Sequence, residues 1–170
     1  MKMLRAMREP LKYVQGKNAC LEFEKEMGYM GKRFLFVCSN SGYKATHDMI
    51  EQSFEGKGDY YRRYEVFGGI SSNGEINRMK AIVEEDNIDV VVAIGGGSAV
   101  DTAKATAYYA GKRIVILPTV AATDAPCTGL SVIYNDDGSF DKYLFYPQNP
   151  DAVMVDTQII ANAPVSFLVA

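Results

Sequence analysis

The sequence predicts an α/β fold, built on a parallel sheet with helices on both faces. Three observations predict it. Apolar runs recur at 34–38, at 88–94 after Asp89, and at 113–117 after Arg113. Segments with the helical spacing of apolar residues stand between these runs. Strands that are apolar along their whole length are typical of a parallel sheet buried between two helix layers.

The first part of the sheet is expected to come from two strands joined by one helix. Residues 34–38 are the first strand, and the Ser-Asn-Ser-Gly sequence at 39–42 is interpreted as a turn. A helix is expected at 43–54, because the glycine-containing segment 55–58 would end it. Polar and aromatic residues alternate over 60–67, which predicts a second strand.

The middle of the chain repeats this alternation of helix and strand. Asn73 is a candidate N-cap for a helix that reaches residue 86. The apolar residues of that helix fall on one face, at Ile76, Met79, Ile82 and Val83. A strand at 88–94, a helix at 98–110 and a strand at 113–117 follow, with Gly111 as the helix stop. The result is a Rossmann-like arrangement.

The pattern changes after the third apolar run. An Asn-Asp-Asp-Gly turn sequence separates two strand-like runs at 130–134 and 142–146, which predicts a β-hairpin excursion from the sheet. A last short strand is expected at 152–155. Asp156 is a candidate cap for a short helix, and Pro164 is suited to open another.

Composition excludes several classes of protein. The chain has 170 residues, 48% of them hydrophobic, which is enough for the core of one domain. Its net charge of -3 gives no electrostatic case for nucleic-acid binding. No apolar run is long enough to cross a bilayer, and the charged N-terminal segment does not resemble a signal peptide. The three cysteines are odd in number and widely spaced, which predicts neither a disulfide framework nor a metal site. The expected location is the reducing cytoplasm.

Three consecutive glycines, Gly95 to Gly97, stand between a predicted strand and the helix that begins at Ser98. Glycine lets a backbone approach a pyrophosphate closely, and the first N–H groups of a helix can donate to its oxygens. A nucleotide site is the functional interpretation. The alternative is a plain strand-to-helix turn, in which Ser98 and Asp101 cap each other. The segment matches neither a P-loop nor the G-x-G-x-x-G fingerprint, whose last glycine is replaced by Val100.

The loop from Thr119 to Thr128 follows the next strand and is the second candidate site. It is rich in hydroxyl groups and carries one acid, Asp124. Ligands of open α/β sheets bind beyond the carboxyl ends of the strands, so Asp124 could hydrogen-bond a polyol there. The alternative is a structural acid in an Asp-Ala-Pro turn. Cys127 is interpreted as a small buried residue, because no histidine is near it in the sequence.

Two other features are interpreted as structural. His47 stands on a predicted helix, where a solvated side chain is expected rather than a catalytic one. The aromatic and basic run at 60–64 is expected to be a half-exposed strand rather than a nucleic-acid surface. No set of His, Cys or carboxylate residues has the spacing of metal ligands.

Several segments occur in the order typical of one enzyme family. They are Gly16-Lys17-Asn18-Ala19, Phe67-Gly68-Gly69-Ile70-Ser71-Ser72, Gly95 through Lys104, Pro118-Thr119, Asp124-Ala125-Pro126-Cys127, Leu130-Ser131-Val132-Ile133-Tyr134, Asn149-Pro150 and Val155-Asp156-Thr157. With these segments the chain resembles the glycerol dehydrogenases of the iron-containing (group III) alcohol dehydrogenase family. The resemblance extends over nearly the whole chain.

The resemblance implies a dehydroquinate synthase-like fold of two domains, of which the helical one would be missing here. Residues 1–162 would be the α/β domain that binds NAD. Residues 163–170 would begin a truncated helical domain that holds a divalent metal, usually zinc. Its ligands, one Asp and two His, are expected beyond Ala170, so neither catalytic nor metal-binding residues are expected within this chain.

The implied reaction is the NAD-dependent oxidation of glycerol to dihydroxyacetone by metal-assisted hydride transfer, in a homo-oligomer. The 170-residue chain alone is expected to bind the cofactor without turnover. Its partner would be a small polyol, not a nucleic acid or a membrane.

The family's contacts are carried over position by position. The pyrophosphate would contact Gly97, Ser98, Ala99, Val100 and Asp101, and Gly95 and Gly96 of the same turn are counted with them as cofactor-binding residues. The nicotinamide site would be lined by Thr119, Ala122, Thr128, Leu130 and Tyr134, with Ala122 acting through its backbone. Asp124 would bind the glycerol hydroxyls. Ser39 stands where the family usually has an Asp for the adenine ribose, so either NAD binds more weakly or Asn40 substitutes for the missing carboxylate. Relaxed discrimination against NADP is also expected.

Two other functions remain open from the sequence. One is a stand-alone nucleotide-binding module without catalysis. The other is a sister dehydrogenase for another polyol or for glycerol phosphate. A phosphorylated substrate favours basic residues near the pocket, and the loop from Thr119 to Thr128 has none.

Overall fold

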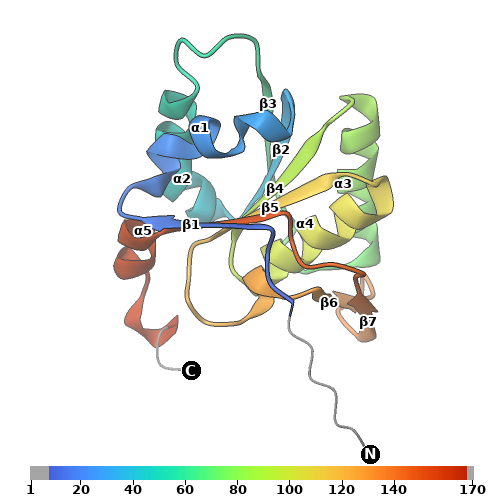
Figure 1. The fold of residues 1–170 in the computed structure, drawn as a ribbon. Coiled ribbons are helices and arrows are strands. Elements are labelled where there is room, and N and C mark those ends of the chain that lie inside the picture. The colour runs from blue at the N-terminus through green and yellow to red at the C-terminus, as the bar shows by residue number, and fades with distance from the viewer. Residues whose placement is uncertain (1–7, 168–170) are drawn as a thin grey trace, which may run out of the picture.

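The computed structural model describes residues 8–167 and confirms the predicted α/β class (Figure 1). Six strands form one parallel sheet in the order β1-β8-β5-β4-β2-β3, and β6 and β7 form a separate antiparallel hairpin. The strands are β1 (Lys12–Gly16), β2 (Arg33–Cys38), β3 (Tyr61–Val66), β4 (Val90–Gly95), β5 (Arg113–Pro118), β6 (Leu130–Tyr134), β7 (Phe140–Phe145) and β8 (Ala152–Asp156). The helices are α1 (Phe23–Met27), α2 (Asn40–Ser53), α3 (Asn73–Glu85), α4 (Gly97–Ala110) and α5 (Thr157–Asn162), with 3-10 turns at Ala19–Glu22, Gly28–Met30, Ala125–Cys127 and Val165–Phe167.

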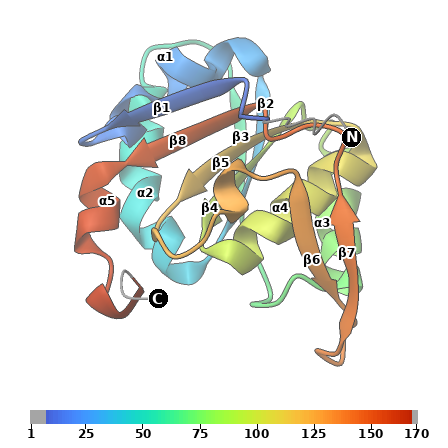
Figure 2. The ribbon, with the colours of Figure 1, turned by 60° about the horizontal axis from the view of Figure 1, so that its bottom comes forward.

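Helices cover both faces of the sheet, as the apolar strands predict (Figure 2). Side chains alternate across a strand, so β2 contributes to two cores. Phe34 and Phe36 pack with α1, α2 and α5 in one core. Leu35 and Val37 pack with α3 and α4 in the other. The continuous apolar runs therefore reflect burial on both faces.

The β6–β7 hairpin adds a fourth layer, outside α3 and α4. Ile133 and Leu144 of the hairpin pack against Ile76 of α3 and Ala105 of α4. Helix α4 is therefore covered by the sheet on one side and by the hairpin on the other. This double cover explains why every residue from 99 to 107 is buried.

The sheet has a switch point between β2 and β4. These strands are neighbours, but α2 follows β2 on one face and α4 follows β4 on the other. Ligands of open α/β sheets bind in the crevice beyond the carboxyl ends of strands at such a point. The starts of α2 and α4 both lie there.

The predicted strands are confirmed, whereas three helix starts differ from the predictions. Helix α2 begins at Asn40, because Ser39 Oγ accepts a hydrogen bond from the N–H of Gly42 (3.0 Å) and the expected turn becomes helical. Ser72, not Asn73, caps α3, since its Oγ accepts from the N–H of Glu75 (3.3 Å).

Helix α4 begins one residue before the predicted start, and its N-cap is Gly96. Within residues 8–167 no side chain caps this helix, so the alternative in which Ser98 and Asp101 cap each other is wrong. Asp156 does cap α5, as predicted, accepting from the N–H groups of Gln158 (3.0 Å) and Ile159 (3.4 Å).

The N-terminal strand and α1 were not predicted. Strand β1 lies at the sheet edge and alternates half-buried and exposed residues, so it lacks the apolar run of the inner strands. After Pro164 the structure shows a 3-10 turn, Val165–Phe167, which ends at the last described residue, so the helix expected there stays a prediction. The rest of the segment expected to begin a further domain, 168–170, lies outside the described residues, as does most of the N-terminal segment, 1–7. The boundary at 162 stays a prediction.

The opposite sheet edge, formed by β3, is half-exposed as expected. Its Arg62 pairs with Glu51 of α2, with Nε and Oε1 at 2.8 Å. His47 was expected to be solvated, but it is half-buried, with ring centroids 4.6 Å from Tyr43 and 4.9 Å from Tyr64. This aromatic packing holds α2 against β3 and gives His47 a structural role.

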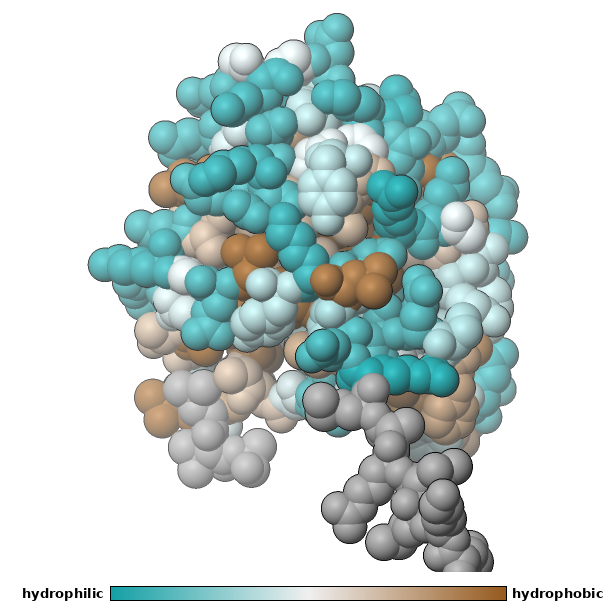
Figure 3. Space-filling view, in the orientation of Figure 1, coloured by the Kyte–Doolittle hydropathy of each residue, from teal (hydrophilic) through white to brown (hydrophobic). Residues whose placement is uncertain are grey.

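The face in Figure 3 is mostly hydrophilic, with small and separate hydrophobic patches. No helix between residues 8 and 167 is both long and apolar enough to span a bilayer.

Candidate functional site

The first glycine of the turn is required by the protein's own packing. Gly95 ends β4 with a φ of 155°, a conformation that L side chains rarely adopt. A Cβ on Gly95 would lie 2.8 Å from the Cβ of Ala99 and 3.2 Å from Ser39 Oγ. The ends of β2 and β4 therefore meet so closely that no side chain fits at this position.

The next two glycines are not required in this way. A Cβ on Gly96 would lie 3.4 Å from Val120 Cγ2, and one on Gly97 would lie 3.9 Å from the Thr123 side chain. Both distances are ordinary contacts, and Gly96 has a φ of -89°, which any residue adopts. The protein leaves room for a side chain at these positions. A ligand that approaches the backbone would use that room.

The start of α4 offers hydrogen-bond donors to such a ligand. The N–H of Val100 donates to the carbonyl of Gly96 (3.1 Å), so the N–H groups of Gly97, Ser98 and Ala99 precede the first backbone hydrogen bond of the helix. Gly96 and Gly97 are half-buried and Ser98 is exposed. With the positive end of the helix dipole, this geometry suits an anion.

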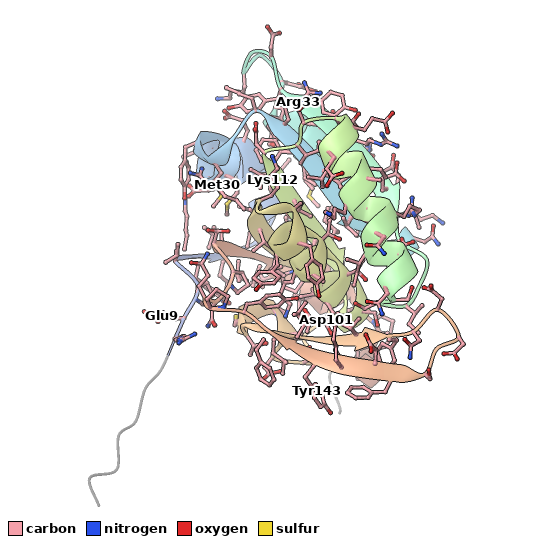
Figure 4. The ribbon with its side chains drawn as sticks, turned by 90° about the vertical axis from the view of Figure 1, so that its right-hand side faces the viewer. Glu9, Met30, Arg33, Asp101, Lys112 and Tyr143 are labelled. Carbon is pink, nitrogen blue, oxygen red and sulfur yellow. The ribbon has the colours of Figure 1, made fainter. Side chains whose placement is uncertain are left out.

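Three residues at the end of the predicted pyrophosphate segment, Ala99, Val100 and Asp101, are buried. Val100 is fully buried. Asp101 lies where α4 meets the β6–β7 hairpin (Figure 4), and its Oδ2 accepts from the N–H of Val132 (3.2 Å). Its Oδ1 lies 3.3 Å from Lys104 Nζ. Burial raises the pKa of Asp101 and lowers that of Lys104, while their mutual attraction opposes both changes. These side chains hold the hairpin, so a ligand would meet the helix through its first turn.

Lys104 also anchors the second candidate site, the loop from Thr119 to Thr128. Its Nζ donates to the carbonyl oxygens of Ala125 (2.9 Å), Thr128 (3.4 Å) and Leu130. At the other side of the loop, Asn149 Nδ2 donates to the carbonyl of Cys127 (2.8 Å). The second half of the loop is therefore fixed to α4 and to the segment before β8.

The beginning of the loop is fixed to the glycine turn. The N–H of Thr119 donates to the carbonyl of Gly95 (3.1 Å). Val120 and Thr123 are the side chains nearest to Gly96 and Gly97. The structure thus brings the two motifs together. Thr119 and Ala122 of the loop are half-buried.

Asp124 is exposed at the N-cap position of the Ala125–Cys127 turn. Its side chain caps nothing there, and within residues 8–167 it has no hydrogen bond or ion pair. It lines a cavity of about 450 Å³ together with Tyr13, Gln15 and Thr157. Its backbone thus fits the turn alternative, but its carboxylate is free to meet a ligand.

Cys127 lies in the same cavity wall and is half-buried. Burial and the nearby Asp124 carboxylate raise the pKa of its thiol. A thiol held in its neutral form is a poor nucleophile, which supports the structural interpretation.

Three predicted nicotinamide contacts lie on or just before β6. Thr128, Leu130 and Tyr134 are all half-buried. Strand β6 runs against α4 in the opposite direction, with Leu130 opposite Lys104 and Val132 opposite Asp101. If this pairing continues by two more residues along β6, Tyr134 lies at the level of the first turn of α4.

Ser39 lies beside the glycine turn. Its hydroxyl oxygen accepts the N–H of Gly42 at the start of α2, and it lies 3.4 Å from Ser41 Oγ. A second cavity, of about 490 Å³, is lined by Ser41, Thr119 and residues of α2 and α5. Ser39 is therefore in place for a ligand at the switch point, but through one hydroxyl group rather than a carboxylate.

The sequence interpretation gave no role to Lys104 or Asn149. A signal for the first was present, because Asp101 and Lys104 are an i, i+3 charge pair inside an otherwise uncharged helix. Charged residues are rarely buried unless paired. Asn149 carried no such signal.

The residues described do not form a metal site. Across 8–167 there is no group of three or more His, Cys, Asp or Glu side chains that could hold a metal ion.

Comparisons with known proteins confirm the resemblance seen in the sequence. The family model for iron-containing alcohol dehydrogenase matches residues 10–157. The chain is 47% identical over 161 residues to the glycerol dehydrogenase of Thermotoga maritima, and this match covers 95% of the chain and 43% of that protein. It is 40% identical over 168 residues to the glycerol dehydrogenase of Escherichia coli O6:H1, covering 99% of the chain and 46% of that protein.

Solved structures agree with these matches. The structure of a probable glycerol dehydrogenase from Sinorhizobium meliloti is similar with a TM-score of 0.87 at 38% identity, covering 98% of this chain and 45% of that one. The chain therefore spans less than half the length of each of these relatives.

Proposed function

Because the chain belongs to the iron-containing alcohol dehydrogenase family, we propose that it is the NAD(H)-binding part of a glycerol dehydrogenase. The pyrophosphate lies on the first turn of α4, behind Gly96 and Gly97. The nicotinamide end extends toward the loop from Thr119 to Thr128 and toward β6. Similarity to glycerol dehydrogenases over nearly the whole chain supports this assignment.

One observation carries the proposal. The chain leaves space for a side chain at Gly97, where a Cβ would meet nothing closer than 3.9 Å. Alanine favours a helix over glycine by about 1 kcal/mol, so glycine here has no advantage for the fold. A diphosphate held by the N–H groups of Gly97, Ser98 and Ala99 would occupy the space of a side chain, which explains why position 97 is a glycine.

The chain's own residues bind and orient the reactants. The N–H groups of α4 fix the diphosphate, and the loop fixes the nicotinamide. Asp124, whose carboxylate is exposed at the edge of a cavity, accepts hydrogen bonds from the glycerol hydroxyls. Bound NAD would accept the hydride; the protein's contribution is to place the two partners.

The family implies a metal, and the residues present do not fit one. Between residues 8 and 167 no set of three metal-ligating side chains comes together. Activation of the glycerol hydroxyl by a metal therefore requires residues other than these. Glycerol oxidation would require those further residues, so the activity proposed for residues 8–167 is the binding of NADH.

Titration of the chain with NADH and with ADP-ribose tests the binding function. Both ligands carry the diphosphate, so saturable binding of both is expected. If neither binds to the folded chain, the proposal is wrong.

The variant Gly97→Ala makes the test specific to the turn. The new methyl group fits the protein but occupies the space of the diphosphate, so both ligands should bind about tenfold more weakly, roughly 1.4 kcal/mol. Gly16→Ala is the matched control, because a Cβ there has nothing within 4 Å and β1 lies three strands away from β4. Equal affinities in Gly97→Ala and the control would contradict the proposal.

A further inference from the structure

We propose that Lys104 is a positioning residue, which holds the nicotinamide-binding loop in register with the diphosphate-binding turn. This inference rests on the proposed function and extends it to a buried side chain that touches neither the cofactor nor the substrate.

The geometry of Lys104 is unusual for a lysine. Its side chain is only 2% exposed, although it carries a charge. All three N–H donors of an ammonium group have acceptors: the carbonyl oxygens of Ala125, Thr128 and Leu130. Asp101 lies 3.3 Å away and supplies the opposite charge. The three carbonyls belong to one short segment, so the lysine gathers that segment around a single point.

The alternative is that Lys104 merely fills the core. Against this, an apolar side chain would fill the same space without the desolvation cost of a buried ammonium. Among the residues that the structure describes, Lys104 Nζ has no acceptor on the six-stranded sheet, and every carbonyl it meets lies within residues 125–130. Its bonds therefore shape the loop rather than the sheet.

The position of Lys104 on α4 aligns the loop with the proposed diphosphate site. The same helix begins at Gly97 with the proposed diphosphate site, and Lys104 stands about two turns further on. Asp101, between them, holds Val132 of β6. One rigid helix thus sets the distance from the diphosphate to Thr128 and Leu130, and to Asp124, which directly precedes the segment that Lys104 holds.

Two ligands separate this role from diphosphate binding itself. NADH contacts both the turn and the loop, whereas ADP-ribose lacks the nicotinamide and contacts the turn. The unaltered chain should therefore bind NADH more tightly than ADP-ribose. In Lys104→Met, NADH affinity should fall about tenfold, toward that of ADP-ribose, while ADP-ribose affinity stays within about twofold. Lys80→Met, on the outer face of α3 and paired with Glu84, is the control and should change neither affinity.

Hydrogen exchange gives a second readout. Faster exchange in Lys104→Met is expected at 120–131 and not in β4 or β5. Where this variant leaves Asp101 unpaired and does not fold, the double variant Asp101→Asn/Lys104→Met removes both charges and is titrated in the same way, with the same expected result.

The outcomes are distinct. Absence of binding of either ligand to the unaltered chain would overturn the proposed function. Binding of both, with equal losses for NADH and ADP-ribose in the variant or with no loss, would overturn the positioning role alone. Equal affinities of the two ligands in the unaltered chain would do the same. Failure of both variants to fold would show that Lys104 holds the whole core, which also contradicts the proposal.

Discussion

Neighbouring glycines in one turn are present for different reasons. Gly95 has a positive φ and no room for a Cβ, so the fold requires it. Gly97 has room and stands at the start of a helix, so the fold does not. The consecutive glycines therefore combine a structural demand with a functional one, and the two can be separated by measuring stability and binding independently.

The substitutions Gly95→Ala and Gly97→Ala should change the free energy of unfolding differently. Gly95→Ala should lower the free energy of unfolding by about 1–3 kcal/mol. The alanine would have to adopt an unfavourable φ, and its Cβ would clash with Ala99. Gly97→Ala should leave stability unchanged or raise it by up to about 1 kcal/mol. Urea unfolding of both variants at one pH measures this. Equal destabilisation by the two substitutions would mean that the turn is required as a whole by the fold.

Ser39 makes a second prediction at the scale of one residue. Asp caps helices as well as Ser does, so Ser39→Asp should preserve the cap of α2. The added carboxylate can accept from both ribose hydroxyls and repels a 2′-phosphate. We expect NADH binding to strengthen and NADPH binding to weaken, so that the ratio of the two dissociation constants shifts by about tenfold.

Ser39→Ala is the control for that ratio. It removes the cap and should lower the free energy of unfolding by about 1 kcal/mol without changing the preference between NADH and NADPH. An unchanged preference in Ser39→Asp would place the ribose elsewhere.

At the scale of elements, one carboxylate ties three segments together. Asp156, fully buried at the end of β8, accepts from the N–H groups of Asn18 (3.1 Å) and Cys20 (3.2 Å) near the N-terminus. It also accepts from the first turn of α5. The short α5 is thereby fixed to the loop that follows β1.

Asp156→Asn should weaken that junction. The amide nitrogen cannot accept the N–H of Cys20 and places a donor against it, which should cost about 2 kcal/mol of unfolding free energy. Faster hydrogen exchange at 17–23 and 157–161 should accompany the loss. The control Asp48→Asn, on an exposed carboxylate of α2, should change stability by less than about 0.5 kcal/mol.

Elements differ in how well the sequence predicts them. The inner strands were predicted because burial on both faces leaves only apolar residues, as at β4. The helix starts differ from the predictions because Ser39 and Ser72 make the capping bonds, so α2 and α3 begin earlier than expected. Edge strand β1 and the short α1 were missed because their local patterns are weak and their packing comes from distant segments.

At the scale of the whole molecule, the candidate site could be predicted only as two separate motifs. The glycine turn and the loop each follow a predicted strand, so their meeting at one edge of the sheet was expected. The contacts of Lys104 were not, because they depend on a segment more than twenty residues away that folds back onto α4. Local periodicity carries no information about such a contact.

The edge formed by α2, β3 and α3 makes the acid sensitivity of the whole fold predictable. Burial acts to raise the pKa of Glu51, but hydrogen bonds from Arg62 and Tyr64 outweigh it and lower that pKa from its ordinary value of 4.5. Burial opposes the arginine bonds of Glu65 in the same way, and its pKa is also lowered. Hydrogen bonds from side chains of β3 lower the pKa of Asp86. All three carboxyls are therefore more acidic folded than unfolded.

The sign of the effect follows from proton binding. Between the folded and unfolded pKa values the unfolded chain binds more protons, so stability from these groups is present above about pH 4.5 and is lost as the pH falls below it. The raised pKa of Asp101 acts in the opposite direction and reduces the loss. Each half-exposed pair contributes at most about 1 kcal/mol, because solvent screens it.

The urea midpoint should therefore change little from pH 7 to 5 and fall below pH 4.5. In Glu51→Gln/Glu65→Gln that fall should be shallower. An unchanged slope would mean that acid unfolding begins elsewhere and not at the β3 edge.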